Sequence, residues 1–90
     1  MKAVEATLEI RNRLGLHLRA ASVLAQAARK FNSSILLRID KQEANARSVT
    51  QLIMLGAGQG TKVRVAIEGD DAVEAAAAIR AIFEDGFGED

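Results

Sequence analysis

The chain has 90 residues, enough for one domain with a single modest hydrophobic core. Its twelve basic and twelve acidic residues give a formal net charge of zero, so overall charge favours neither nucleic acid nor a membrane surface as a partner. Three phenylalanines are the only aromatic residues and cysteine is absent, which excludes an aromatic platform for single-stranded nucleic acid and any disulfide or thiol chemistry.

Residues 2–10 alternate between apolar and polar side chains, which predicts a strand with one buried face. Residues 11–16 follow as a loop. Residues 18–31 carry apolar side chains at helical spacing and predict an alanine-rich helix that can pack closely against a sheet. No segment has the pattern of a signal peptide or of a membrane span, and we expect a cytoplasmic protein.

The middle of the chain predicts two strands and a short helix. Residues 35–39 alternate as a second strand, and residues 43–46 form a short third strand at a sheet edge. The turn between them, residues 40–42, contains no glycine, so a tight primed hairpin is not expected. Ser48 is the expected N-cap of a helix over residues 48–55, with Gln51 completing a capping box.

The last third of the chain predicts a fourth strand over residues 61–68 and a final helix. An aspartate, Asp70 or Asp71, is expected to cap this helix, and Gly86 is expected to end it. The residues after it, 87–90, are interpreted as an acidic tail.

The predicted order of elements is therefore βαββαβα. Strands with one apolar face require helices on one face of the sheet, so we expect an α+β open-faced sandwich with a four-stranded antiparallel sheet and three helices on one face. The chain shows no internal repeat or linker, and residues 1–90 are expected to form a single domain.

The only histidine, His17, follows a glycine turn and stands at the start of the first predicted helix. The unpaired N–H groups and the dipole at such a helix start favour an anion. Arg19, in the first turn, opposes that dipole and offers a planar cation suited to phosphate or carboxylate, which indicates an anionic guest. Neutral imidazole is also a nucleophile. Together these features indicate a histidine that can receive a phosphoryl group.

The residues alone leave other interpretations of His17 open. A lone histidine is more often a surface or packing residue than a functional one. A metal site would have to be built from carboxylates, and none is expected. A Ser-His-Asp hydrolase is compatible with the composition, although no nucleophile elbow is visible. No cofactor is expected.

Two segments match a known pattern. Asn12-Arg13-Leu14-Gly15-Leu16-His17-Leu18-Arg19-Ala20-Ala21 follows the signature Asn-x-x-Gly-Leu-His-x-Arg-Pro-Ala, and Asn45-Ala46-Arg47-Ser48-Val49, with Leu52 and Leu55-Gly56, follows a regulatory-serine segment. With both motifs, essentially the whole chain resembles the HPr family, the histidine-containing phosphocarriers of the bacterial phosphotransferase system, in its sugar or nitrogen-related branch. The chain departs from the family pattern where Ala20 replaces a proline and where Thr50 replaces a large apolar residue.

This resemblance implies the HPr-like strand order 1-4-2-3, with the Ser48 helix beside His17. It implies that Nδ1 of His17 accepts a phosphoryl group from phospho-enzyme I and passes it to an EIIA-type acceptor. The protein would be a carrier in a relay rather than a self-contained enzyme. The rival interpretation from another class is a regulatory binding module of the same fold, acting by protein–protein contact.

The resemblance also implies roles for residues around His17. Arg19, Leu18 and Asn12 would bind the phosphoryl oxygens, and Ser48 would be a regulatory phosphorylation site for an HPr kinase/phosphorylase, as in some members. We expect a monomer that binds neither nucleic acid nor membrane. The docking surface for enzyme I and EIIA-type partners would consist of Leu16, Leu18, Val49 and Leu52.

Overall fold

The computed structural model describes residues 2–89, and the elements follow the predicted order. Four strands form one antiparallel sheet in the order β1-β4-β2-β3, so the expected fold and the strand order implied by the resemblance are confirmed. The elements are β1 (Lys2–Glu9), α1 (Leu18–Ala28), β2 (Ser34–Ile39), β3 (Gln42–Asn45), α2 (Val49–Met54), β4 (Lys62–Gly69), α3 (Ala72–Glu84) and the short 3₁₀ turn η1 (Gly86–Gly88).

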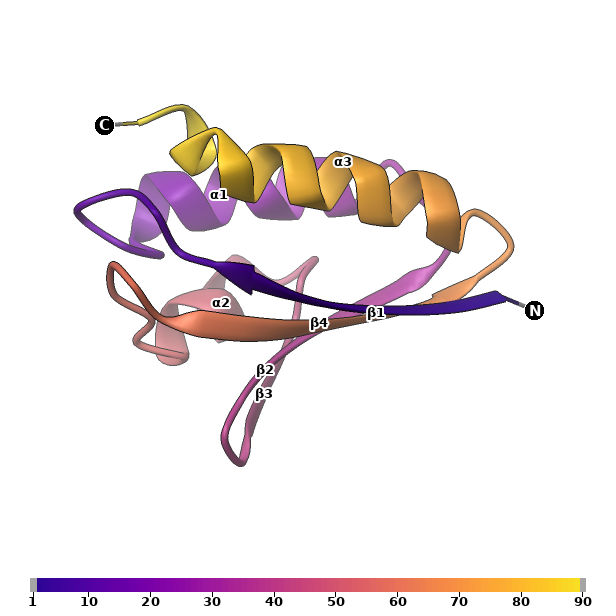
Figure 1. The fold of residues 1–90 in the computed structure, drawn as a ribbon, viewed down its shortest axis with the longest axis horizontal. Helices are drawn as coiled ribbons and strands as arrows, with labels where there is room; N and C mark the ends of the chain where they lie inside the picture. Colours follow the sequence, from indigo (N-terminus) through magenta and orange to yellow (C-terminus); the bar gives the residue numbers. More distant parts are fainter. Residues whose placement is uncertain (1, 90) are drawn as a thin grey trace.

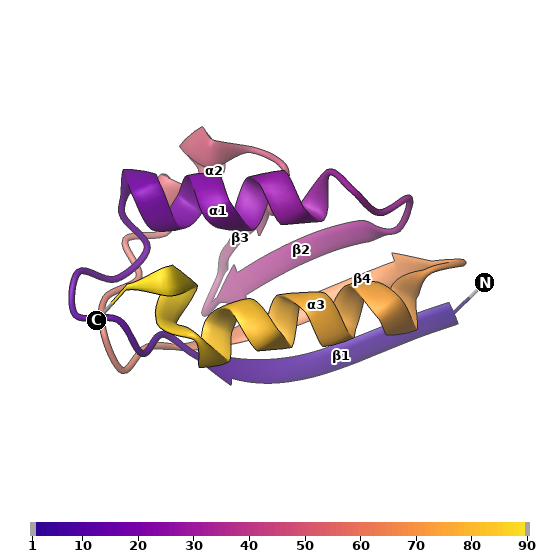
Figure 2. The same ribbon diagram turned by 90° about the horizontal axis from the view of Figure 1, so that it is seen from above.

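The alternating pattern of the strands decides which face of the sheet is covered. Leu8 of β1 pairs with Val63 of β4, and both side chains are buried beneath the helices. In Figure 1, α1 and α3 lie on the same side of the sheet. Figure 2 shows them side by side, with α2 beyond α1; α2 packs against α1 and β3. The predicted β1 face is confirmed, because the polar residues between its apolar positions are exposed.

Two local predictions are wrong: where the first helix ends, and how β2 connects to β3. The first helix ends at Ala28 rather than residue 31, because the N–H groups of Lys30 and Phe31 bond to carbonyls three residues back and tighten the last turn. The link between β2 and β3 is a tight two-residue turn, since Ile39 pairs directly with Gln42. Asp40 adopts a positive φ of 53°, a conformation that aspartate tolerates better than most non-glycine residues.

Asp71 stands at the N-cap position of α3, but its side chain does not cap the helix as predicted. Its carboxylate instead accepts hydrogen bonds from the backbone N–H groups of Asn32 and Ser33, at 2.8 and 2.9 Å, and from the Ser33 hydroxyl at 2.5 Å. The bond from the Ser33 hydroxyl is the main reason that the pKa of Asp71 lies below its usual value. This carboxylate therefore ties the turn after α1 to the start of α3.

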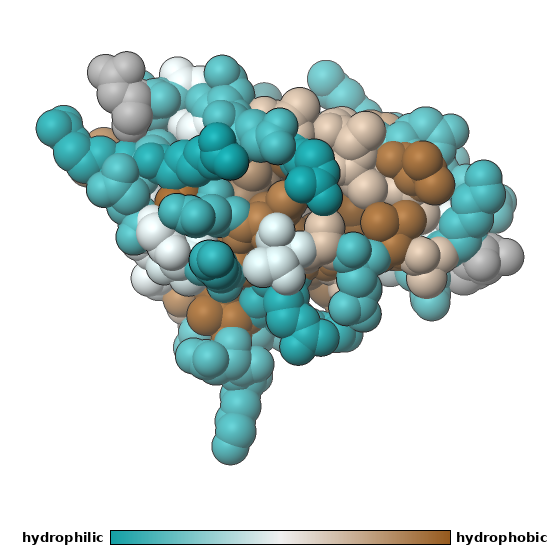
Figure 3. All heavy atoms as spheres, viewed as in Figure 1, coloured by the Kyte–Doolittle hydropathy of each residue, from teal (hydrophilic) through white to brown (hydrophobic). Residues whose placement is uncertain are grey.

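Between residues 2 and 89, no helix has both the length and the apolar character that crossing a membrane would require. The face seen in Figure 1 carries hydrophilic residues around its margins and weakly or strongly apolar residues between them, over α3 (Figure 3). The alanine-rich α3 also exposes the side chain of Val73.

Candidate functional site

Loop 11–16 brings His17 to the start of α1 by docking against residues 57 and 58. The N–H of Leu16 donates to the carbonyl of Ala57 at 2.9 Å. Gly15 has a φ of +70°, and a Cβ at this position would lie 2.4 Å from the same carbonyl oxygen. Only glycine fits this conformation and this contact, so the glycine before His17 is required by the path of the loop.

His17 is the N-cap residue of α1 and has an extended backbone conformation, with φ −80° and ψ −175°. Its carbonyl accepts the first helical hydrogen bond, from Ala21 at 2.8 Å. The N–H groups of Leu18, Arg19 and Ala20 find no acceptor within residues 2–89. These three donors at the positive end of the helix are therefore available to an anion.

Arg19 extends from this first turn and is exposed to solvent. With Arg13, Leu14, Gly88 and Glu89 it lines a shallow surface hollow. No ion pair within 4.0 Å holds its guanidinium in the described part of the chain. Arg19 therefore offers a cation beside His17 that an incoming anion can contact.

The imidazole of His17 contacts Glu89, a residue that no local sequence pattern places beside it. Its Nε2 lies 2.7 Å from Oε1 and 2.8 Å from Oε2 of Glu89. The His17 side chain is 30% exposed and that of Glu89 is 12% exposed. The hydrogen bond with His17 is the main reason that the pKa of Glu89 lies below its usual value; Asn12 and the charge of Arg19 act in the same direction, while partial burial opposes them.

Asn12 joins the loop to this pair. Its Nδ2 donates to the carbonyl of Gly15 at 2.7 Å and to Oε1 of Glu89 at 2.9 Å. These two bonds use both hydrogens of the amide, and the side chain is buried. In this arrangement Asn12 therefore positions the loop and Glu89, and its expected bond to a phosphoryl group stays a prediction.

The segment after α3, residues 85–89, packs against the domain and forms part of the site, so it is more than an acidic tail. Phe87 is 2% exposed, and its ring packs on that of Phe83 with 5.0 Å between centroids. It holds a φ of 58°, which is uncommon for a large residue and is stabilised here by burial of the ring. An aromatic residue between Gly86 and Gly88 is the sequence signal that could have revealed this anchor. Asp90 lies outside the described residues.

The structure separates the four residues expected to form a docking surface. Leu18 is 65% exposed and Val49 is half-buried, but Leu16 and Leu52 are 4% and 0% exposed and belong to the core. Their predicted role as surface contacts is wrong, because both side chains point into the packing between sheet and helices. The large apolar side chains exposed on loop 11–16, α1 and α2 are Leu14, Leu18, Val23, Ile53 and Met54.

Ser48 caps α2 as predicted, since its hydroxyl accepts the N–H of Gln51 at 3.2 Å. The capping box is only half formed. The Gln51 side chain accepts the N–H of Asn45 at 2.8 Å, and the N–H of Ser48 bonds instead to the Asn45 carbonyl. Ser48 therefore has a structural role in this fold.

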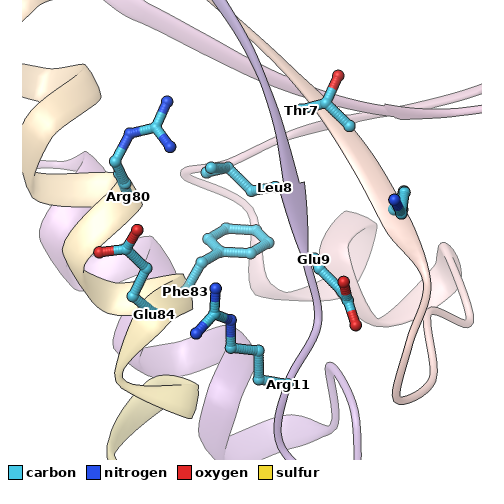
Figure 4. A pocket seen from close by; sticks show the side chains of 8 residues that line it. Thr7, Leu8, Glu9, Arg11, Arg80, Phe83 and Glu84 are labelled. Carbon is cyan, nitrogen blue, oxygen red and sulfur yellow. The ribbon is translucent and has the colours of Figure 1, made fainter.

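A second hollow lies between β1 and α3 (Figure 4). Arg11, Arg80, Glu9 and Glu84 line it, with Phe83 beneath them. It contains charges of both signs and no histidine. It therefore offers no nucleophile comparable with His17.

Comparison with known proteins identifies the family of the chain. Residues 4–85 match the family described as "PTS HPr component phosphorylation site". The chain is 41% identical over 87 residues to the phosphocarrier protein HPr of Xylella fastidiosa, covering 97% of this chain and 98% of that protein. It is 42% identical over 88 residues to the phosphocarrier protein NPr of Escherichia coli, with coverage of 97% and 98%.

Solved structures show the same relationship. HPr-C-His from Thermoanaerobacter tengcongensis superposes with a TM-score of 0.91 at 42% identity, covering 100% of this chain and 99% of that one. An HPr dimer from the same organism superposes with a TM-score of 0.77 at 43% identity, covering 99% and 100%. The likeness to these proteins therefore does not support the expectation of a monomer.

Proposed function

The chain belongs to the HPr family of phosphocarrier proteins of the phosphotransferase system, and we propose that His17 is the residue on which it carries the phosphoryl group. The observation that supports this most is the position of the His17 imidazole at the start of α1. A partly exposed imidazole stands at the N-cap of α1, where three N–H groups find no acceptor among residues 2–89 and Arg19 is free to contact an anion. Phosphoryl oxygens match these donors in charge and geometry.

The donor in this proposal is phospho-enzyme I, and the acceptor is an EIIA-type protein in the cytoplasm. Leu14 and Leu18, 67% and 65% exposed on either side of His17, offer an apolar surround on which both partners can dock in turn. HPr and NPr relatives match almost equally well, at 41% and 42% identity. The proposal therefore covers both the sugar and the nitrogen-related branch.

Labelled phosphoenolpyruvate and enzyme I test this function directly. The chain should acquire label that is stable to base and lost in acid, as expected of a phosphohistidine. A known carrier labelled in parallel shows that enzyme I is competent. If that control is labelled and this chain is not, the regulatory binding module becomes the better interpretation.

Arg19→Lys should slow phosphoryl transfer about ten- to hundredfold. Lysine keeps the charge but loses the planar pair of donors that can hold two phosphoryl oxygens, and one charge-assisted hydrogen bond is worth roughly 1.5–3 kcal/mol. Rapid-quench measurement of transfer in both directions gives the effect. Arg80→Lys, on the exposed side of α3, is the matched control. Equal rates for the two variants would mean that Arg19 does not hold the phosphoryl group.

We also propose that Ser48 is a regulatory site, as in relatives modified by HPr kinase/phosphorylase. Ser48→Asp should fold about as well as the wild type, since aspartate is a good N-cap, but should accept phosphate several-fold more slowly at limiting enzyme I. The added charge would lie at the N-cap of α2, the helix that exposes Ile53 and Met54. Ser48→Asn keeps the cap without the charge and should behave as wild type. Equal slowing by both variants would exclude a charge effect.

A further inference from the structure

The contact between Glu89 and His17 has no part in the proposed function so far. Both carboxylate oxygens lie within hydrogen-bond distance of the same ring nitrogen, Nε2, at 2.7 and 2.8 Å. Asn12 holds Oε1 from another side at 2.9 Å. The other ring nitrogen, Nδ1, makes no hydrogen bond within residues 2–89.

This arrangement determines where the proton of the neutral ring lies. An ionised carboxylate can only accept hydrogen bonds, so the proton between Glu89 and the ring is assigned to Nε2. The lone pair of the neutral imidazole is then on Nδ1, the nitrogen that has no partner. Glu89 thus selects the nucleophilic atom of His17.

We propose that Glu89 is a positioning residue for phosphoryl transfer, which holds the His17 ring in the tautomer with its lone pair on Nδ1 and balances the charge that the ring acquires. This inference rests on the proposed function. In the transfer step, the Nδ1 lone pair forms a bond to phosphorus while the bond from phosphorus to the donor breaks and its electron pair leaves with the donor. The proton stays on Nε2, so the phosphorylated ring is an imidazolium facing Glu89.

The effect on transfer follows from this charge. A carboxylate within 2.8 Å of Nε2 attracts the imidazolium more strongly than the neutral ring, so its contribution increases as the N–P bond forms. Carboxylates that orient a histidine through its second nitrogen act in this way at hydrolase and metal sites. When the phosphoryl group leaves and the ring becomes neutral again, this added attraction ends, while the hydrogen bond between Nε2 and Glu89 remains.

Glu89 is held firmly enough for this role. Its side chain is 12% exposed, and the preceding Phe87 is buried against Phe83 in the core. The N–H of Glu89 donates to the Gly86 carbonyl at 3.0 Å, which closes the turn between the aromatic anchor and the carboxylate. The bond from Asn12 then ties Glu89 to the loop that carries His17.

Two variants of the full chain separate the charge of Glu89 from its contact. Glu89→Gln removes the charge while keeping the shape of the side chain, and Glu89→Ala removes the contact. Glu84→Gln, an exposed carboxylate at the end of α3, is the matched control. Thermal melts establish that each variant folds. The initial rate of labelling by enzyme I and ¹⁵N chemical shifts of the His17 ring at about pH 8, above the usual titration range of imidazole, are then measured.

We expect labelling to slow at least about tenfold in both Glu89 variants and to stay unchanged in Glu84→Gln. The ¹⁵N shifts of the wild type should report a proton on Nε2, and Glu89→Ala should show a larger fraction of the other tautomer. A structural role alone would not change this tautomer signature.

Other outcomes overturn the inference. Unchanged rates, or unchanged ring shifts in Glu89→Ala, would show that Glu89 does not position the ring. Faster labelling of either variant would show that Glu89 covers the site instead of assisting it. If the wild type itself takes up no label beside a competent control, the proposed function is wrong; label on the wild type with unaffected variants contradicts only the role of Glu89.

Discussion

His17→Ala is expected to abolish the uptake of acid-labile phosphate completely. The chain contains no second histidine and no cysteine that could accept the group in its place. The fold should persist, because the side chain is 30% exposed and the core forms without it. Labelling by enzyme I measures the loss, and a thermal melt of the same sample shows whether the protein is folded.

A second variant separates the nucleophile from the contact with Glu89. His17→Gln can still donate a hydrogen bond to a carboxylate but has no ring nitrogen to attack phosphorus. It should remain unlabelled with a melting temperature close to that of the wild type. Acid-labile phosphate on either His17 variant would contradict the assignment of the site.

Leu52→Ala is expected to destabilise the protein by about 2–5 kcal/mol, the usual cost of truncating a fully buried leucine. That is a large part of the roughly 5–15 kcal/mol that stabilises a typical domain. Leu52 is 0% exposed on α2, which packs against α1 and β3. Urea unfolding followed by circular dichroism measures the change in the free energy of unfolding.

The neighbouring residue provides the control. Ile53 is 40% exposed on the same helix, and Ile53→Ala should cost about 1 kcal/mol or less. If Leu52→Ala were as stable as the wild type but were phosphorylated more slowly by enzyme I, Leu52 would be a surface contact. That result would contradict the burial described above.

The arrangement of elements could be predicted because periodicity reports which side chains are buried. The alternation in β1 and β4 and the helical spacing in α1 and α3 all appear in the structure. The order β1-β4-β2-β3 could not be read from periodicity, since an apolar face does not identify its neighbour; it came from the resemblance. The tight turn at Asp40 could not be predicted, because residues 40–42 contain no glycine, the residue that most often marks a positive φ.

The site was predicted as far as local sequence determines it. His17, Arg19 and the start of α1 are neighbours in the chain, so their proximity follows from one helix turn. Glu89 is 72 residues from His17, and no local pattern connects them. The resemblance implies surface roles for Leu16 and Leu52, and spacing could not correct this, because spacing shows that a residue is apolar but not which of several apolar residues reaches the core.

The position of β4 in the sheet has a consequence for synthesis of the protein on the ribosome. β4 is the last strand in the chain, yet it lies between β1 and β2, and Lys2 pairs with Gly69. Until residues 62–69 emerge, β1 has no partner strand, and Leu8 has no core to enter. At roughly 5–20 residues per second, this leaves the first strand exposed for several seconds. The sheet is therefore completed late, by a strand that pairs with β1 on one side and β2 on the other.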